Sequence, residues 1–221
     1  MAIDGSNDGS PALLDDLQTS CGDRLRLLAL PLNEGKGTAL LSAISLAYAE
    51  DFSHALTMDS DGQHPPENIP DFMSLGAVHP TDLLMGQPIF GSDASLARVL
   101  GKELTLWMTG LETPGAKLGD TLLGMRLNPI RGFLEAFHQT RFARGFDFDP
   151  EIAVRMAWLG HTPRQVPVRV RYVSKDKGGV SHFYYLRDDI RLTAPHFRLL
   201  PECLFCRVIP FLARHSQGET L

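Results

Sequence analysis

The sequence predicts an α/β fold in which a mostly parallel sheet is flanked by helices. In the first half of the chain, short apolar segments typical of buried strands alternate with longer segments of helical periodicity. Alternation of this kind implies parallel strands whose two faces are covered by helices. The chain has 221 residues, of which 43% are hydrophobic, so it is long enough to form one domain with a sizeable core.

The first half contains three strand and helix pairs. The first helix is predicted by apolar residues spaced three and four apart, from Leu40 to Ala47. Two prolines and an acidic residue at Pro65–Glu67 mark the start of the next helix. In chain order, the expected strands lie at 25–31, 55–58 and 82–85, and the expected helices lie at 36–50, 65–76 and 94–111.

The second half is less regular. The segment at 119–128 indicates a loop that contains a strand. Apolar and polar residues alternate at 165–173, which is typical of a half-exposed strand. Helices are expected at 150–159, 184–199 and 202–214.

Charge and cysteine content narrow the class of protein. The formal net charge of -5 argues against a nucleic-acid binder, which normally carries a basic face. Three cysteines give no disulfide framework, so we expect a reducing compartment, with Cys203 and Cys206 as core residues. The sequence shows no signal peptide and no apolar stretch of the roughly 18 residues that span a bilayer. We therefore expect a cytoplasmic protein, soluble or peripheral to the inner face of the cell membrane.

Asp59 and Asp61 follow directly after an apolar strand. In an extended segment, residues i and i+2 face the same way, so both carboxylates can reach one divalent cation, with Gln63 as a third oxygen ligand. Such hard oxygen ligands suit Mg²⁺ or Mn²⁺, which commonly bind through one or two carboxylates and substrate phosphates. A solvated turn is the alternative, but the position after a buried strand favours a metal site.

Two further segments combine charge with glycine. Asp4 and Gly5 precede a run of small residues, as in a strand-to-helix loop beside a nucleotide, where Asp4 would bind a base or ribose edge. An ordinary N-terminal turn is the alternative. At Asn33–Gly37, two glycines surround Lys36 at a helix start, which suits a phosphate contact, although a solvated turn explains the segment equally well.

In this order and at this spacing, the three segments resemble the motifs of family 2 glycosyltransferases, which have the Rossmann-like GT-A fold. The most similar branch contains the dolichyl- and polyprenyl-phosphate sugar transferases. That branch also has an Asp-x-x-x-Gly-x-Arg-Leu segment, here Asp120–Leu127. Further on, segments like Gly145–Ile152 and a late Gly-x-Ser-basic element, here Gly179–His182, are usual. The resemblance extends to about residue 200.

The resemblance implies transfer of a sugar, with inversion, from a UDP- or GDP-linked sugar to a lipid-phosphate or lipid-linked acceptor. Asp59, Asp61 and Gln63 would hold Mg²⁺ or Mn²⁺ on the diphosphate. Asp120 is the candidate catalytic carboxylate on the acceptor side. It would act as a base for a hydroxyl acceptor, whereas a phosphomonoester is already largely ionised. The implied nucleotide-sugar contacts are Ala2, Asp4, Lys36, Met58, Ser60 and Gln87, and the implied acceptor or phosphate contacts are Arg126, Arg171 and His182.

The sequence departs from the family pattern in three ways. The family's usual first strand, with its helix and base-binding loop, has no counterpart before Ala2, so we expect an N-terminally truncated domain with unpaired edges on the neighbouring strands. Ile3 stands where the family has an aspartate, and His182 where it has a lysine. Within these limits, we expect a glycosyltransferase domain at 1–200 and an amphipathic helical tail at 201–221.

Several alternatives stay open. A nucleotidyltransferase also places Asp-x-Asp near a nucleotide, and a non-catalytic paralogue that binds nucleotide sugar or lipid weakly fits the departures. Helix capping explains Asp149, and a structural pair with Asp120 explains Arg126. Apolar residues interleaved with arginines at 183–214 suit either an interfacial helix with peripheral membrane contact or packing against the domain.

Overall fold

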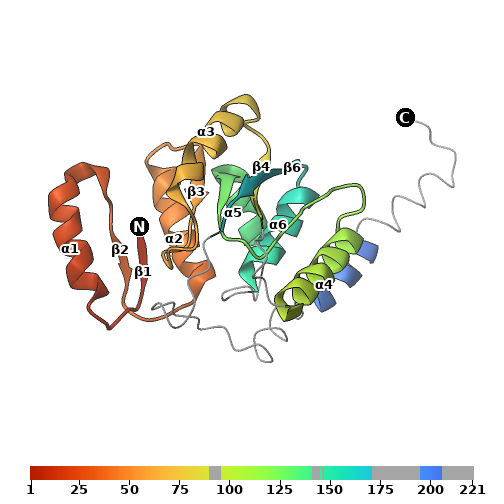
Figure 1. Cartoon of the computed structure of the whole chain (residues 1–221), viewed down its shortest axis with the longest axis horizontal. Helices are drawn as coiled ribbons and strands as arrows, with labels where there is room; N and C mark the ends of the chain where they lie inside the picture. Colours follow the sequence, from red (N-terminus) through yellow and green to blue (C-terminus); the bar gives the residue numbers. More distant parts are fainter. Residues whose placement is uncertain (90–95, 141–144, 146, 171–194, 206–221) are drawn as a thin grey trace, which may run out of the picture.

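The computed structural model describes residues 1–89, 96–140, 145, 147–170 and 195–205 (Figure 1). The strands are β1 (Ala2–Asp4), β2 (Leu28–Leu30), β3 (His54–Thr57), β4 (Leu83–Pro88), β5 (Arg126–Pro129) and β6 (Pro163–Val168). The α-helices are α1 (Ser10–Cys21), α2 (Lys36–Ala49), α3 (Ile69–Val78), α4 (Leu96–Glu112), α5 (Ile130–His138) and α6 (Phe148–Trp158). Short 3-10 helices lie at Gly22–Arg24 and Pro66–Asn68, and residues 195–203 form a further helical segment.

The strands form two hydrogen-bonded groups. β1 and β2 make a parallel pair, and the other four strands make a sheet with the order β3-β5-β4-β6. In this sheet β5 runs antiparallel to β3 and β4, whereas β4 and β6 are parallel. β3, β4 and β6 therefore point the same way, and β5 is the reversed strand. The α/β class with a mostly parallel sheet is confirmed.

β4 separates two layers of the hydrophobic core. Its side chains alternate between the faces of the sheet, so Leu83 and Met85 join one layer and Leu84 joins the other. α2, α5 and α6 complete the first layer, which includes Phe148. α3 covers the second layer through Phe72, which is fully buried. Helices thus cover both faces of the sheet, as the alternation of elements predicted.

The pair β1–β2 lies with α1 at one end of the molecule (Figure 1). α2 contacts both β1 and β3, so it bridges the two groups of strands. Among the described residues, no ladder hydrogen bond joins β1 to β3, and each of these strands pairs on one side. These are the two unpaired edges that the family resemblance led us to expect. α1 contributes no buried residue to the core.

The C-terminal helical segment, blue in Figure 1, lies beside α4. His196 Nδ1 lies 2.7 Å from Glu112 Oε1 of α4, and Glu202 accepts two hydrogen bonds of 2.9 Å from Arg155 of α6. The expected boundary between residues 200 and 201 falls inside this segment, and the two-part division stays a prediction. Among the helices that the structure describes, none has the length and apolarity needed to cross a membrane.

The predicted elements of the first half are confirmed to within a few residues, but the sequence analysis gave no bounds for β1 and α1, which precede them. Sequence analysis assigned no element to α5, which starts directly after β5. The strand expected at 165–173 is β6, which ends at Val168. The helices expected at 184–199 and 202–214 are described only at 195–205, where the chain is helical throughout.

Candidate active site

The three predicted metal ligands, Asp59, Asp61 and Gln63, lie on the loop that follows β3. Asp59 is half-buried, whereas Asp61 is exposed. The backbone N–H of Gln63 donates a 2.9 Å hydrogen bond to Asp61 Oδ1, and Gly62 between them adopts a left-handed φ of 76°. An aspartate that accepts from the backbone two residues later, followed by glycine, makes a tight turn. The sequence Asp-Gly-Gln therefore folds locally and turns the chain just after the strand.

His64 orients the backbone of Asp59 from the other side of this turn. Its Nδ1 accepts a 2.9 Å hydrogen bond from the Asp59 backbone N–H, so we assign the ring proton to Nε2. Nε2 lies 3.8 Å from Asp59 Oδ2. Burial lowers the pKa of His64, and the nearby carboxylates of Asp59 and Asp61 offset this effect only in part. The ring is therefore neutral at pH 7, and it holds the backbone of Asp59 through this hydrogen bond rather than through a charge.

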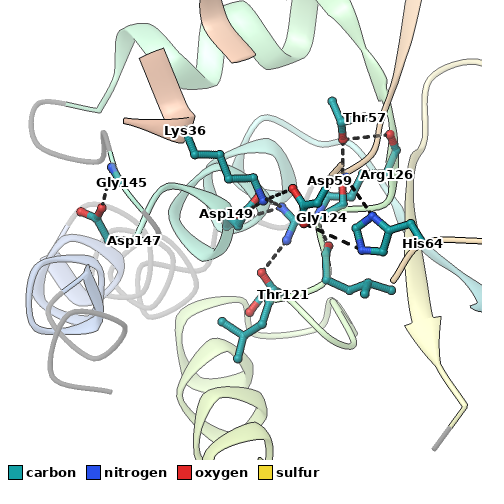
Figure 2. A network of polar contacts seen from close by, with 12 residues as sticks. Lys36, Thr57, Asp59, His64, Thr121, Gly124, Arg126, Gly145, Asp147 and Asp149 are labelled. Atoms are coloured by element: carbon teal, nitrogen blue, oxygen red, sulfur yellow. Dashed lines mark hydrogen bonds and ion pairs between the residues drawn. The ribbon is translucent and has the colours of Figure 1, made fainter. Parts of the chain in front are cut away.

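Lys36 is the first residue of α2, and its side chain reaches two carboxylates at once (Figure 2). Its Nζ lies 2.8 Å from Asp59 Oδ1 and 2.7 Å from Asp149 Oδ2. Burial alone would lower the pKa of Lys36, but the negative charges of Asp149 and Asp59 outweigh burial and raise it. Lys36 is therefore a fixed positive charge between the end of β3 and the start of α6.

Asp149 lies inside the first turn of α6 and is buried. Burial alone would raise the pKa of Asp149, but the charges of Lys36 and Arg126 outweigh it and lower the pKa. The capping explanation for this residue was wrong, because the N-cap position belongs to Asp147 and the carboxylate of Asp149 bonds to Lys36. Sequence analysis missed Asp149 as a site residue, since its partner lies 113 positions away in the chain.

Arg126, at the start of β5, is also buried in this network (Figure 2). It donates to the backbone carbonyls of Asp149 at 2.7 Å, of Leu123 at 3.1 Å, and of Thr121. Arg126 therefore ties the loop before β5 to the start of α6. The alternative of a structural pair with Asp120 and the contact with acceptor or phosphate both stay predictions.

The loop before β5 closes over Asp59. Thr57 Oγ1 donates a 2.9 Å hydrogen bond to the carbonyl of Gly124, which holds this loop against the end of β3. A Cβ atom at Gly124 would lie 2.5 Å from Asp59 Oδ2 and 2.8 Å from Lys36 Nζ. The backbone approaches the two charged groups so closely that only glycine fits without a shift. This contact gives a physical reason for the glycine in the Asp-x-x-x-Gly-x-Arg segment.

Asp120, the candidate catalytic carboxylate, begins the same loop and is buried. Its Oδ1 accepts hydrogen bonds from the backbone N–H groups of Leu122 at 2.9 Å and Leu123 at 3.3 Å. Its own N–H donates to Gln87 Oε1 at 3.0 Å. Gln87 lines a cavity of about 340 Å³ between α4, β4 and the chain before Asp120, with Thr109, Lys117 and Gln165 among its other polar residues. Asp120 is thus placed beside a cavity, at the opposite end of its loop from Gly124.

Asp4 connects the first two motifs of the sequence. Its two carboxylate oxygens accept from the backbone N–H groups of Glu34 at 2.7 Å and Gly35 at 2.9 Å, just before α2. At Gly5, which has a φ of 61°, a Cβ atom would lie 2.2 Å from the backbone nitrogen of Asn33. In this structure, the close backbone approach at Gly5 joins two loops of the protein. The expected nucleotide contact of Asp4 stays a prediction.

The remaining predicted residues take several positions. Ala2 lies in β1, Met58 packs against the second core layer, and Ser60 is exposed on the loop after β3. Arg171 and His182 lie outside the described residues. Of the predicted set, the structure brings Asp59 into contact with Lys36 and Asp120 into contact with Gln87. Asp149, His64 and Gly124 lie around the first pair.

The loop after β3 carries oxygen donors of the kind that hard divalent cations prefer, although it turns at 61–63 instead of staying extended as predicted, and the metal site stays a prediction. Asp59 and Asp61 supply carboxylate oxygens, and Asp59 already pairs with a positive charge. In the part of the chain that the structure describes, no group of three or more His, Cys, Asp and Glu side chains is arranged to hold a metal ion. Further ligands would come from Gln63, water and substrate phosphates, which is the usual way Mg²⁺ binds.

The fold and the site define an α/β protein with carboxylates at a strand end and a lysine at a helix N-terminus, an arrangement suited to phosphate-bearing ligands. A comparison with protein families gives a match to glycosyl transferase family 2 over residues 1–147 of the 221. The chain therefore belongs to this family.

Two curated relatives are similar to parts of the chain. An undecaprenyl-phosphate mannosyltransferase from Micrococcus luteus is 24% identical over 157 residues, covering 66% of this chain and 59% of the relative. A polyprenol monophosphomannose synthase from Mycolicibacterium smegmatis is 35% identical over 66 residues, covering 30% of this chain and 25% of the relative. The chain thus spans less than two thirds of the length of either relative.

Proposed function

We propose that this protein transfers a sugar, with inversion, from a nucleotide diphosphate sugar to a lipid-phosphate or lipid-linked acceptor. The observation that carries the proposal is the family match over residues 1–147, which includes the Asp59–Lys36 site. The names of the two relatives, which act on undecaprenyl phosphate and form polyprenol monophosphomannose, support this class of acceptor. Mannose is accordingly the first sugar to test, with the donor linked to GDP or UDP.

On the donor side, Asp59, Asp61 and Gln63 would hold Mg²⁺ or Mn²⁺ at the end of β3. When bound, the metal would supply positive charge to the diphosphate leaving group and orient it. His64 and Gly124 keep the Asp59 carboxylate in place, since one bonds its backbone N–H and the other leaves room for its oxygen. The N-terminus of α2, with Lys36, adds a favourable potential for phosphate.

On the acceptor side, Asp120 and the cavity beside it are the proposed elements. The lining of the cavity includes the polar residues Thr109, Lys117 and Gln165, which suits a polar head group, and α4, which forms one wall, also carries exposed apolar side chains. A phosphomonoester acceptor, with its second pKa near about 6, is largely ionised at pH 7 and needs no base. With such an acceptor, Asp120 would position the phosphate through the loop that it organises.

Peripheral membrane contact at the inner face of the cell membrane is part of this proposal. Trp107 of α4 is 62% exposed and Phe197 of the C-terminal helical segment is 74% exposed. The two helices are neighbours, because His196 bonds to Glu112. Other large apolar side chains exposed on these helices are Leu104, Leu111, Leu204 and Phe205. An apolar surface of this kind suits the interface of a bilayer.

The proposal is tested by ligand binding and turnover on the full chain. UDP, GDP and their mannose conjugates, each with and without Mn²⁺, should raise the unfolding temperature if they bind the folded state. Incubation with polyprenyl phosphate should then yield a glycosylated lipid and free nucleoside diphosphate. Release of pyrophosphate would instead indicate a nucleotidyltransferase, and binding without turnover a non-catalytic paralogue. No thermal shift with any nucleotide would overturn the proposal.

A further inference from the structure

The Lys36 ammonium group has one open partner and one enclosed partner. The Asp59 side chain is 35% exposed, whereas the Asp149 side chain is only 9% exposed. Lys36 lies between them at nearly equal distances of 2.8 Å and 2.7 Å. Asp149 also has the buried guanidinium of Arg126 at 3.8 Å, so it remains ionised whatever happens at Asp59. Lys36 can therefore lose its ion pair with the more exposed Asp59 and keep its ion pair with the buried Asp149.

We propose that Lys36 and a divalent cation compete for Asp59, and that Asp149 is the positioning residue that holds Lys36 when the cation binds. This inference rests on the proposed function, because it concerns the metal ligand Asp59. It assigns to Asp149 a role in setting metal affinity, whereas a capping residue of α6 would have none.

Crowding around Asp59 supports competition. Oδ1 faces Lys36, and Oδ2 is enclosed by His64 and by the backbone at Gly124. A divalent ion on Asp59 would lie within a few ångströms of the ammonium group, where like charges repel strongly in a partly buried site. Since His64 is neutral and Gly124 has no side chain, Lys36 is the neighbour of Asp59 whose charge opposes the metal.

The test is the affinity of the full chain for Mn²⁺, measured by electron paramagnetic resonance without nucleotide. In Lys36→Met, Mn²⁺ should bind about five- to tenfold more tightly, the equivalent of one partly exposed ion pair. In Asp149→Asn, Mn²⁺ should bind several-fold more weakly, because the lysine then depends on Asp59 alone. The control Arg24→Met, which removes an exposed charge near the end of α1, should leave the affinity unchanged.

The double variant Lys36→Met/Asp149→Asn is the decisive measurement. It removes one positive and one negative charge, so the local net charge stays the same. The buried Arg126 loses Asp149 as an ionic partner but keeps its hydrogen bonds to backbone carbonyls. If Lys36 competes with the metal, the double variant still binds Mn²⁺ more tightly than the wild type. It also preserves the test if Lys36→Met alone fails to fold, which thermal unfolding reports.

The outcomes separate this inference from the proposed function. Unchanged or weaker Mn²⁺ binding in both Lys36 variants, with clear binding by the wild type, overturns the competition and leaves the transferase proposal standing. In that case Lys36 would orient Asp59. If neither the wild type nor any variant binds Mn²⁺, the competition and the metal part of the proposed function are both wrong.

Discussion

At the scale of single residues, the site depends on contacts that each motif makes with another motif. Asp59 comes from the loop after β3, Lys36 from the start of α2, and Asp149 from the first turn of α6. Gly124 belongs to a fourth segment and touches two of these charges through its backbone. The residue types follow from these contacts, because a buried carboxylate needs a cation and a crowded backbone needs a glycine.

Gly124→Ala should damage the metal site without changing any charged residue. The new methyl group would lie 2.5 Å from Asp59 Oδ2 and 3.0 Å from Asp59 Cγ, so the carboxylate has to move. We expect Mn²⁺ affinity to fall about tenfold, measured by the same resonance titration. Gly110→Ala is the matched control, because a Cβ atom there has nothing within 4 Å and a helix interior favours alanine. Equal affinity in both variants would contradict the prediction.

The buried charge of Asp149 should make stability depend on pH. Its pKa is lowered in the folded state, so its contribution is present above its unfolded pKa of about 4 and is lost as the pH falls through the folded pKa. At pH 7, Asp149→Asn should lower the free energy of unfolding by about 3 kcal/mol. Urea unfolding between pH 3 and 7 should show this difference shrinking in acid. The exposed Asp15→Asn serves as control, and a difference that stays constant with pH would argue against the assignment.

At the scale of elements, the C-terminal helical segment is joined to the domain by buried charges. Arg155 of α6 bonds to Glu151 one turn earlier and to Glu202 of the segment, each at 2.9 Å. Arg198 of the segment donates a 2.6 Å hydrogen bond to Glu151. An ion pair therefore accounts for Arg198, the one arginine of this described part, while Phe197 stays exposed.

Arg155→Met should destabilise the fold by about 3–5 kcal/mol, because it leaves the buried Glu151 with Arg198 as its remaining basic partner in the described network. Glu202→Gln should cost only about 1 kcal/mol, since that carboxylate is partly exposed. Urea unfolding measures both changes. Arg131→Met, on the exposed side of α5, is the matched control. A loss for Arg155→Met no larger than for the control would show that the ion pairs of Arg155 contribute little to stability.

The elements at the N-terminal end should open more readily than the rest. α1 has no buried residue, and β1 and β2 pair with each other alone among the described strands. Few buried contacts mean a low free energy of local opening. Hydrogen–deuterium exchange followed by mass spectrometry should show faster exchange in α1 than in α5, which buries five of its nine residues. Similar protection of the two helices would refute this prediction.

At the scale of the whole molecule, the proposed metal site and the exposed apolar surface lie on different elements, and the loop at 119–125 lies between them. Asp120 stands near α4, and Gly124 stands against Asp59. A donor at the end of β3 and an acceptor beside α4 would therefore meet at this loop. The arrangement suits a soluble donor that approaches from one side and a lipid acceptor that approaches from the other.

Trp107→Asp should weaken binding to phosphatidylcholine vesicles about tenfold, because it replaces a large exposed apolar side chain with a charge. Co-sedimentation of the full chain measures the effect, and the unfolding temperature confirms that the fold is kept. Phe52→Asp is the control, since Phe52 is also exposed but lies in the turn between α2 and β3. An equal loss in both variants would point to non-specific association.

The sequence by itself determined the α/β class, the order of most elements and three of the motifs around the site. These features depend on local patterns: apolar periodicity sets the strands and helices, and Asp59–Gln63 forms a turn through its own hydrogen bonds. The position of Lys36 at a helix start is likewise a local property. Each could be predicted because its physical cause lies within a few residues along the chain.

Only the tertiary structure decided the partners. Asp149 had the sequence signature of a helix cap, yet its carboxylate bonds to Lys36, 113 positions earlier. Arg126 bonds to the carbonyl of Thr121 in its own motif and also to the carbonyl of Asp149, 23 positions later, which no local pattern indicated. Burial determines these partners. A charge removed from water is stable only beside an opposite charge or a polar group, which can come from any part of the sequence.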